Sequence, residues 1–384
     1  MAVVFCASSF GEVRNGVDVL VVEKFERLAG ASVGLITNHT GRSRSGVSTI
    51  DLLAGAPGVT LKALFSPEHG IRGKLEEDQI QDGRDPKTGL PVYSLYGERK
   101  APSAAQLKGM DTLVFDIQDI GCRFYTYIST LRLCMEVAAE RGLRFVVLDR
   151  VNPIGGKVVE GPVLLDEEKF TATHALAIRH GMTVGELATM MNAERRIGAR
   201  LEVVQVEGWR RSKRFDETGL PWIDPSPNIR NLEAALVYPG IGLLEFSISV
   251  GRGTDRPFEI LGASYIDGER LAAELQGRKL RGVKVEPVVF TPAASVFAGK
   301  RCEGVRWNVT DGDDLHPVAL GIEIAAALRR LYPEDFDVEK VNILLNHRKA
   351  FAALKAGLGP EEIRATWVRE LETFRQRRKR FLLY

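Results

Sequence analysis

The sequence lacks the short motifs that identify most nucleotide- and metal-dependent enzymes. No G-x-G-x-x-G follows the first apolar run and no G-x-x-x-x-G-K-[ST] occurs, so nucleotide binding has no motif support. G-x-S-x-G is also absent, which removes the usual signal of a serine hydrolase. The 6 histidines form no H-E-x-x-H pair, so we predict no metal and no cofactor. A metal site built from His39, His69 and an aspartate is the weaker alternative, because no complete ligand set can be assembled.

Cysteine is scarce and shows no pattern. The 4 cysteines have no metal-type spacing, and no disulfide can be inferred from them. We therefore interpret them as free, buried thiols, which behave as small apolar side chains.

An excess of charge of one sign is also missing, as are long apolar runs. The net charge of +2 creates no broad field that would attract nucleic acid or an anionic membrane. The dense basic run "RQRRKRF" near the C-terminus is predicted to be a solvated helix end, where cations oppose the helix dipole. No apolar stretch approaches the roughly 20 residues that span a bilayer. The N-terminal segment "MAVVFCASSFGEVRNG" has no basic region before its short apolar stretch, so it is a poor secretory signal.

What the chain does contain is the composition of a soluble globular protein, with 45% hydrophobic and 27% charged residues. Its length of 384 residues favours two domains over one core. The composition gives no indication of the oligomeric state.

The first half of the chain alternates short apolar runs with helix-like segments. Helical patterns occur in "GVSTIDLLAG", "SAAQLKGM" and "ISTLRLCMEVAAERG". Continuous runs of Val, Ile, Leu and Phe separated by helices are typical of a parallel sheet that is covered on both faces. The sequence therefore predicts an α/β domain, doubly wound or close to it. The predicted strands are 33–38, 59–66, 90–96, 111–117 and 143–149.

The first domain continues with a helix that has a capping box at Thr183 and Glu186, followed by a strand at "LEVVQVEGW". A smaller α+β domain is predicted beyond it. The proline-dense stretch 219–242 is interpreted as a connector that lines a surface, and we place the domain boundary near 232. The predicted domains are thus 1–231 and 232–384. The predicted strands beyond the boundary are "FEILGASYID", "VKVEPVVFTP" and "VRWNVTD", and the predicted helices are "PVALGIEIAAALRRLY" and "PEEIRATWVRELETFRQRRKRF".

Polar and ionisable side chains gather after the strands of the first domain. In an open parallel sheet, ligands bind in the crevice outside the carboxyl ends of the strands, so four such strand ends predict a site. The residues concerned are Asn38 and His39 after the first strand; Glu68, His69 and Arg72 after the second; Asp116, Gln118, Asp119, Arg123, Tyr125 and Tyr127 in and after the fourth; and Arg150 and Asn152 after the fifth.

Carboxylates are in surplus among these residues, and Glu160 adds another. Glycoside hydrolysis uses a carboxyl group to protonate the leaving oxygen and a second group to attack, activate water or orient the sugar. Each carboxylate also has a structural interpretation. Glu68 could satisfy a helix start, Asp116 could be a buried strand residue that orders a loop, and Asp119 could be a turn residue. The tyrosines could belong to the core or present faces to a sugar ring.

A series of ordered motifs carries a resemblance to a known family. They are "GLITNHTG", "LFSPEHGIRG", "TGLPVYSLYG", "FDIQDIGCRFYTYISTL", "DRVNPIGG", "VEGPVL", "IRHGMTVGEL", "PSPNI", "VYPG", "GRGTDRPFE" and "RKRFLLY". Over roughly 16–384 the sequence resembles the NamZ (YbbC-like) family of exo-β-N-acetylmuramidases, which act on peptidoglycan fragments.

The resemblance implies a Rossmann-like N-terminal domain, a smaller C-terminal domain and an active-site cleft between them. It also implies hydrolysis of the β-1,4 bond that holds N-acetylmuramic acid at the non-reducing end, with Glu68 as the catalytic glutamate. The second carboxylate stays open between Asp116, Asp119 and Glu160, and the 2-acetamido group of the substrate could take its place. Family members are commonly exported to the periplasm or secreted, whereas this N-terminus also allows a cytoplasmic location.

Recognition of the 3-O-lactyl carboxylate of N-acetylmuramic acid predicts an arginine in the site, because a guanidinium can hold a carboxylate through two hydrogen bonds. Arg72, Arg123 and Arg252 are the candidates, and Arg123 is preferred because Tyr125 and Tyr127 follow it. The remaining predicted substrate-binding residues are Asn38, His39, His69, Gln118, Asp119, Tyr125 and Asn152.

The sequence departs from the family pattern in two places. Where the family reads something like "EGTNLSVGRGT", this chain reads "LEFSISVGRGT"; it keeps Glu245 and has Phe246, Ser247 and Ile248 in place of the following Gly-Thr-Asn. "DRVNP" also has Val151 where proline is usual. The first departure motivates an alternative function, a carbohydrate- or muropeptide-binding protein that has lost catalysis on the same scaffold.

Overall fold

The computed structural model describes residues 12–67, 71, 82–278 and 280–384. Within these ranges, the helices are all too short or too polar to cross a membrane.

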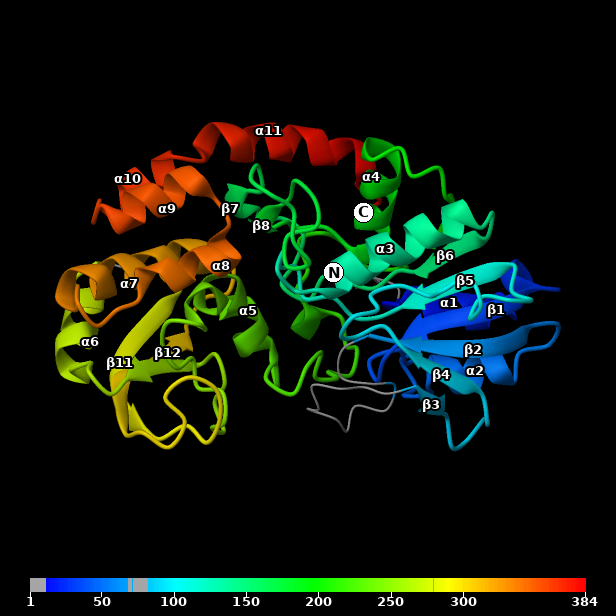
Figure 1. The fold of residues 1–384 in the computed structure, drawn as a ribbon, viewed down its shortest axis with the longest axis horizontal. Coiled ribbons are helices and arrows are strands. Elements are labelled where there is room, and N and C mark those ends of the chain that lie inside the picture. Colours follow the sequence, from blue (N-terminus) through cyan, green and yellow to red (C-terminus); the bar gives the residue numbers. More distant parts are fainter. Residues whose placement is uncertain (1–11, 68–70, 72–81, 279) are drawn as a thin grey trace, which may run out of the picture.

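The N-terminal part is built on a sheet of seven strands in the order β3-β4-β2-β1-β5-β6-β9 (Figure 1). Its strand pairs are parallel, except that β3 runs antiparallel to β4. The predicted α/β class is confirmed. The strands are β1 (Ser32–Thr37), β2 (Thr60–Ser66), β3 (Gly83–Arg84), β4 (Pro91–Ser94), β5 (Thr112–Asp116), β6 (Arg144–Leu148) and β9 (Arg200–Val204).

Helices cover both faces of this sheet, which is why its strands are apolar throughout. Along β1, Val33 and Leu35 join the core under one pair of helices, while Ile36 joins the core under the other pair. Gly34 is required on this second face, since a Cβ there would lie 2.8 Å from the side chain of Phe65. The first pair is α1 (Gly16–Val22) and α2 (Thr49–Ala54), and the second is α3 (Tyr127–Glu140) and α4 (Val184–Glu194), whose predicted capping box is present.

The strand order creates a switch point between β1 and β5. From β1 the chain proceeds to β2 and then to β4 on one side, and it returns to place β5 on the other side of β1. The loops that follow β1 and β5 therefore diverge, and the crevice between them is the usual ligand position in such sheets.

The C-terminal part contains a three-stranded antiparallel sheet in the order β10-β12-β11, with helices packed against it (Figure 1). A two-stranded ribbon, β7 (Glu160–Val163) with β8 (Ala177–Arg179), lies between the two parts. The elements are α5 (Leu232–Ile241), β10 (Ile260–Ala263), α6 (Gly268–Gln276), β11 (Val283–Phe290), β12 (Cys302–Val309), α7 (Pro317–Leu331), α8 (Asn342–Leu345), α9 (Arg348–Lys355), α10 (Pro360–Ala365) and α11 (Val368–Arg378).

Two predictions of local structure were wrong. Residues 103–110, predicted as a helix, form successive turns. The proline-dense stretch 219–242 ends in helix α5, which contains Pro239. Its N-cap is Asn231, whose side chain accepts a hydrogen bond from the Ala234 N–H at 2.8 Å. Packing overrides the proline here, because α5 is buried and Gly240 brings its backbone against Gly321 of α7.

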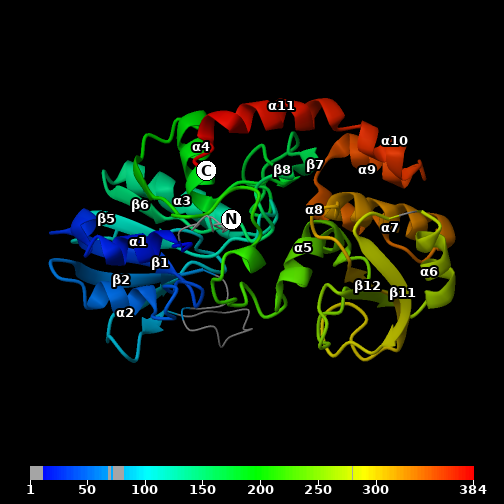
Figure 2. The same ribbon diagram turned by 180° about the vertical axis from the view of Figure 1, so that it is seen from behind.

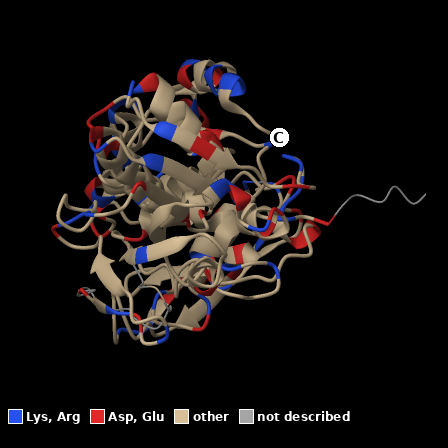
Figure 3. Ribbon diagram, turned by 90° about the vertical axis from the view of Figure 1, so that its right-hand side faces the viewer, with Lys and Arg blue, Asp and Glu red and all other residues tan. Residues whose placement is uncertain are grey.

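The basic run at the C-terminus is a contact between the two parts of the molecule, in contrast to the predicted solvated helix end. Helix α11 leads back from the C-terminal part to the N-terminal part (Figure 2). Arg378 is buried, and its guanidinium donates to the carbonyl oxygens of Gly156 at 3.1 Å and Gly181 at 2.7 Å. Elsewhere basic and acidic residues are interspersed along the ribbon (Figure 3), in keeping with a net charge of +2.

Candidate active site

The side chains after β1 are held in the crevice by the loop 220–226. The Asn38 amide donates to the Tyr127 hydroxyl at 2.8 Å, and this hydroxyl donates to the carbonyl oxygen of Pro225 at 3.3 Å. The Nε2 atom of His39 lies 2.7 Å from the carbonyl oxygen of Asp224. Because burial lowers the pKa of His39, its ring is neutral at pH 7 and donates this hydrogen bond from Nε2. Both residues thus anchor the loop over the strand ends.

Asp116 is a structural residue, which corrects its prediction as a catalytic carboxylate. Its side chain is 0% exposed, and its two oxygens lie 2.6 and 2.9 Å from Nε and Nη2 of Arg150. The Thr49 hydroxyl also donates to the carboxylate. This ion pair ties the end of β5 to the end of β6 and to α2. No face of the carboxylate remains for a sugar.

Buried polar side chains order the loops that follow β5 and β6. The Gln118 amide donates to the carbonyl oxygen of Val151 at 2.9 Å, and the Asn152 amide donates to that of Met182 at 3.0 Å. Asp119 accepts a hydrogen bond from the Gly121 N–H at 2.7 Å, the turn role given above as its structural interpretation. All three polar side chains are buried.

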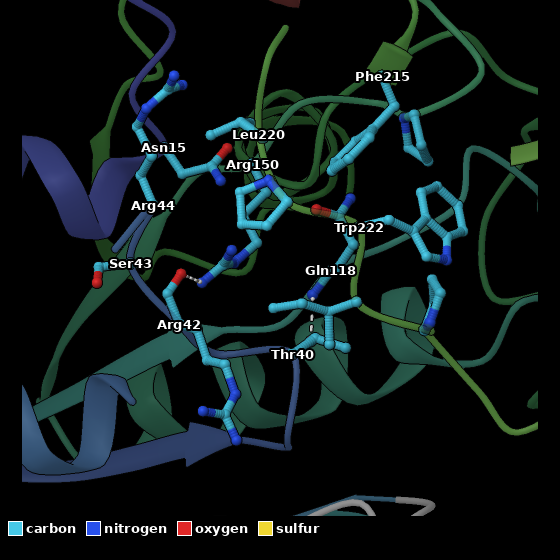
Figure 4. Close-up of a pocket in the computed structure, with 14 residues that line it drawn as sticks. Asn15, Thr40, Arg42, Ser43, Arg44, Gln118, Arg150, Phe215, Leu220 and Trp222 are labelled. Carbon is cyan, nitrogen blue, oxygen red and sulfur yellow. Dashed lines mark hydrogen bonds between the residues drawn. The ribbon is translucent and has the colours of Figure 1, made fainter. Parts of the chain in front are cut away.

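A small pocket lies beside Gln118 and Arg150 (Figure 4). Thr40, Phe215 and Trp222 contribute to its wall, and the backbone N–H of Gln118 donates to the Thr40 hydroxyl at 3.0 Å. Its volume of about 20 Å³ is that of roughly one water molecule. It is too small to hold a sugar ring.

A larger pocket lies where the two parts of the chain meet, and we call it the interdomain pocket. Its volume is about 150 Å³, and it contains the predicted site residues Tyr125 and Arg252. Arg252 donates to Glu245 at 2.7 Å and stacks over the ring of Phe258 at 5.2 Å. Aromatic faces beside a charged pair suit a ligand that is both apolar and polar, such as a sugar. The pocket is lined by Phe124, Tyr125, Thr126, Tyr127, Thr171, Ser226, Tyr238, Glu245, Phe246, Arg252, Phe258 and Leu344.

The sequence had not assigned several of these residues to the site. Tyr238, Glu245 and Phe246 belong to the second part of the chain, and Ser226 belongs to the loop over the strand ends. The available signals were the motif "VYPG", which contains Tyr238, and the segment that carries both Glu245 and Arg252.

Arg123, the preferred lactyl-binding residue, has a different role. It is 0% exposed, and its guanidinium donates to four carbonyl oxygens at 2.7–3.3 Å. Burial lowers its pKa to about 10, so it remains cationic at pH 7. Because two carbonyls come from each part of the chain, Arg123 joins the two parts from within and cannot reach a ligand. The acceptors are Pro162, Leu176, Leu344 and Leu345.

Glu160 lies outside the interdomain pocket, against the start of helix α7. Its Oε1 atom accepts a hydrogen bond from the Ala319 N–H at 2.6 Å, the favourable position for a carboxylate at a helix N-terminus. Burial raises its pKa to about 7. The carboxyl group thus joins β7 to α7, and its prediction as the second catalytic carboxylate is not supported by this position.

Glu68, His69 and Arg72 lie outside the described residues. The strand that precedes them, β2, ends at Ser66 and is the neighbour of β1 in the sheet. In the part of the chain that is described, no three side chains of His, Cys, Asp or Glu come together to hold a metal ion.

The fold and the interdomain pocket define a class: a two-part α/β protein whose candidate ligand site lies between a parallel-sheet domain and a smaller domain. Two family models match it, "Exo-beta-N-acetylmuramidase NamZ, N-terminal" over residues 33–233 and "Exo-beta-N-acetylmuramidase NamZ, C-terminal" over residues 236–384. The chain belongs to the NamZ family, and the predicted resemblance is confirmed.

Relatives match over nearly the whole chain. The peptidoglycan beta-N-acetylmuramidase NamZ of Bacillus subtilis (strain 168) is 42% identical over 379 residues, which cover 97% of this chain and 92% of that protein. Two crystal structures of DUF1343 family proteins from Bacteroides fragilis NCTC 9343 superpose with TM-scores of 0.90 and 0.79, at 36% and 30% identity. Each covers 97% of this chain and 99% of its own.

Proposed function

We propose that this protein is an exo-β-N-acetylmuramidase, a glycoside hydrolase that releases N-acetylmuramic acid from the non-reducing end of peptidoglycan fragments. The observation that carries the proposal is the 42% identity to the Bacillus subtilis enzyme over 97% of the chain. The family match extends over both parts of the chain, between which the interdomain pocket lies. The alternative of a binding protein without catalysis has no support from these relatives.

Glu68 is the proposed general acid. In the sequence it follows the last residue of β2, the strand next to β1, by two positions. A carboxyl group that stays protonated near neutral pH can give its proton to the leaving glycosidic oxygen. The group that assists from the other side is either a second carboxylate or the 2-acetamido group of the substrate. Since Asp116 is held by Arg150 and Glu160 by α7, Asp119 is the one of the three predicted carboxylates that remains a candidate for this role.

The test is hydrolysis of the disaccharide N-acetylmuramyl-β-1,4-N-acetylglucosamine. We expect free N-acetylmuramic acid as a product, and we expect Glu68→Gln to lower kcat by about 10²–10⁴-fold, the usual contribution of a general acid. Glu167→Gln, at an exposed glutamate that does not line the interdomain pocket, is the control and should retain activity. Binding of the disaccharide by the unaltered protein without turnover would overturn the proposal in favour of a binding protein.

A further inference from the structure

Six aromatic rings line the described part of the interdomain pocket, and five of them are buried. The buried rings pack on one another, with the Tyr238 ring edge-on to that of Phe258 at 4.8 Å and to that of Tyr125 at 6.0 Å. Such rings have little free face to offer a ligand. Phe246 differs, because 40% of it is exposed.

The chain on either side of Phe246 is fixed. The Ser247 hydroxyl donates to the carbonyl oxygen of Asp337 at 2.9 Å, and the Ser247 N–H donates to that of Leu244 at 2.9 Å. Ile248 is fully buried in the core. Between residues 241 and 250, Phe246 is the single exposed residue. The backbone that carries Phe246 is therefore held in position at the pocket, so a ligand that covers the side chain does not have to order this segment.

The neighbours of Phe246 complete a surface that suits a sugar. Glu245 precedes it and forms the ion pair with Arg252, so charged hydrogen-bonding groups stand beside an exposed aromatic ring. A β-linked pyranose has polar groups around its edge and C–H groups on its faces. The negative face of an aromatic ring attracts such C–H groups, and covering the ring removes apolar surface from water.

From these observations we infer that Phe246 is a substrate-binding residue that stacks on a pyranose ring in the interdomain pocket. The inference rests on the proposed function and adds a residue to it. It also gives a role to the segment in which this chain departs from the family pattern. Within this segment Ile248 is buried and cannot contact sugar, whereas Phe246 is exposed at the pocket.

The kinetic test compares Phe246→Ala with Phe246→Tyr on the disaccharide. Loss of the ring should raise KM about tenfold, with little change in kcat, because stacking is lost in the ground state and the transition state alike. The tyrosine variant, which keeps the ring, should restore KM. The control is Leu358→Ala, an apolar residue of similar exposure (42%) that does not line the pocket. An unchanged KM in Phe246→Ala, or an equal rise in Leu358→Ala, would overturn the inference.

Competitive inhibition identifies the sugar that is stacked. If the terminal sugar contacts Phe246, the inhibition constant of free N-acetylmuramic acid rises in Phe246→Ala; if the leaving sugar does, that of free N-acetylglucosamine rises. An unchanged constant for both sugars contradicts the stacking. Should the unaltered protein show no turnover, the proposed function fails by itself. Calorimetric titration of the same two sugars into the unaltered protein and Phe246→Ala then decides the inference, with equal affinities overturning it.

Discussion

At the scale of single residues, burial separates arginines that the sequence treats alike. Arg123 and Arg252 both stand near aromatic residues, and both were candidates for the lactyl carboxylate. The structure surrounds Arg123 with carbonyl oxygens and leaves the Arg252 side chain 33% exposed in the interdomain pocket. Arg252 can therefore form a hydrogen bond to a ligand. Arg123 cannot do so without losing its carbonyl acceptors, which would leave a buried guanidinium unpaired.

We therefore expect Arg252 to contribute to recognition of the 3-O-lactyl carboxylate. Arg252→Ala should raise KM for the N-acetylmuramic acid disaccharide about ten- to a hundredfold, because a charged hydrogen-bonding partner is lost. The measurement is steady-state kinetics on this substrate and on the N-acetylglucosamine disaccharide, which has no lactyl group.

Weak activity on the second substrate should change little in this variant. Arg256→Ala is the control, since Arg256 is exposed four residues further along. If Arg252→Ala weakens both substrates equally, the lactyl carboxylate is bound by another group, and Arg72 becomes the next arginine to replace.

At the scale of helices and strands, the sequence predicted those elements whose structure depends mainly on their own residues. The apolar runs predicted β1, β2, β4, β5 and β6 because a strand covered on both faces needs apolar residues throughout. Helix α5 was missed because its stability comes from packing against α7, which overrides Pro239. Likewise, the partner of Glu160 could not be predicted, since Ala319 is separated from it by 159 residues.

The contact between Glu160 and α7 predicts a pH dependence of stability. Folding raises the pKa of this carboxyl group from 4.5 to about 7, chiefly because burial disfavours its charged form. The folded state thus binds the proton more tightly than the unfolded chain does. The group's contribution to stability is fully present below pH 4.5 and is lost as the pH rises through about 7.

Glu160→Gln keeps the acceptor for the Ala319 N–H and removes the charge. Relative to the unaltered protein, its free energy of unfolding should therefore increase by about 1–3 kcal/mol as the pH rises through this interval. Urea denaturation at a series of pH values measures the difference. Exposed Glu167→Gln serves as the control. Parallel pH profiles for Glu160→Gln and the unaltered protein would show that the carboxyl group does not titrate in this way.

At the scale of the whole molecule, the site is formed by residues that no spacing in the sequence connects. Tyr125 and Arg252 reach the same pocket from the two parts of the chain. Their meeting depends on how the parts pack, and on contacts such as those of Arg123 and Arg378 with carbonyl groups across the molecule. The sequence could identify the strand ends as one wall of the site. The resemblance to the family predicted that a second domain forms the opposite wall, and the structure identified the residues of that wall.

Tyr384 is the last of these contacts along the chain. Its hydroxyl donates to the buried carboxylate of Asp149 at 2.6 Å and accepts from the Val206 N–H at 2.8 Å. Burial raises the pKa of Asp149 to about 6, with the Tyr384 hydrogen bond opposing the rise. Tyr384→Phe leaves both partners buried with one hydrogen bond fewer, which should lower the free energy of unfolding by about 1–3 kcal/mol.

This loss should affect both parts of the molecule together, because one hydrophobic core includes Phe145 of β6 and Trp307 of β12. We expect the unaltered protein and Tyr384→Phe each to unfold in a single transition, with tryptophan fluorescence and far-ultraviolet circular dichroism giving the same midpoint. Tyr332→Phe is the matched control, since the Tyr332 hydroxyl bonds to the backbone of Asp267 within the C-terminal part. Separate midpoints for the two probes would mean that the parts unfold independently, and that Tyr384 stabilises the N-terminal sheet alone.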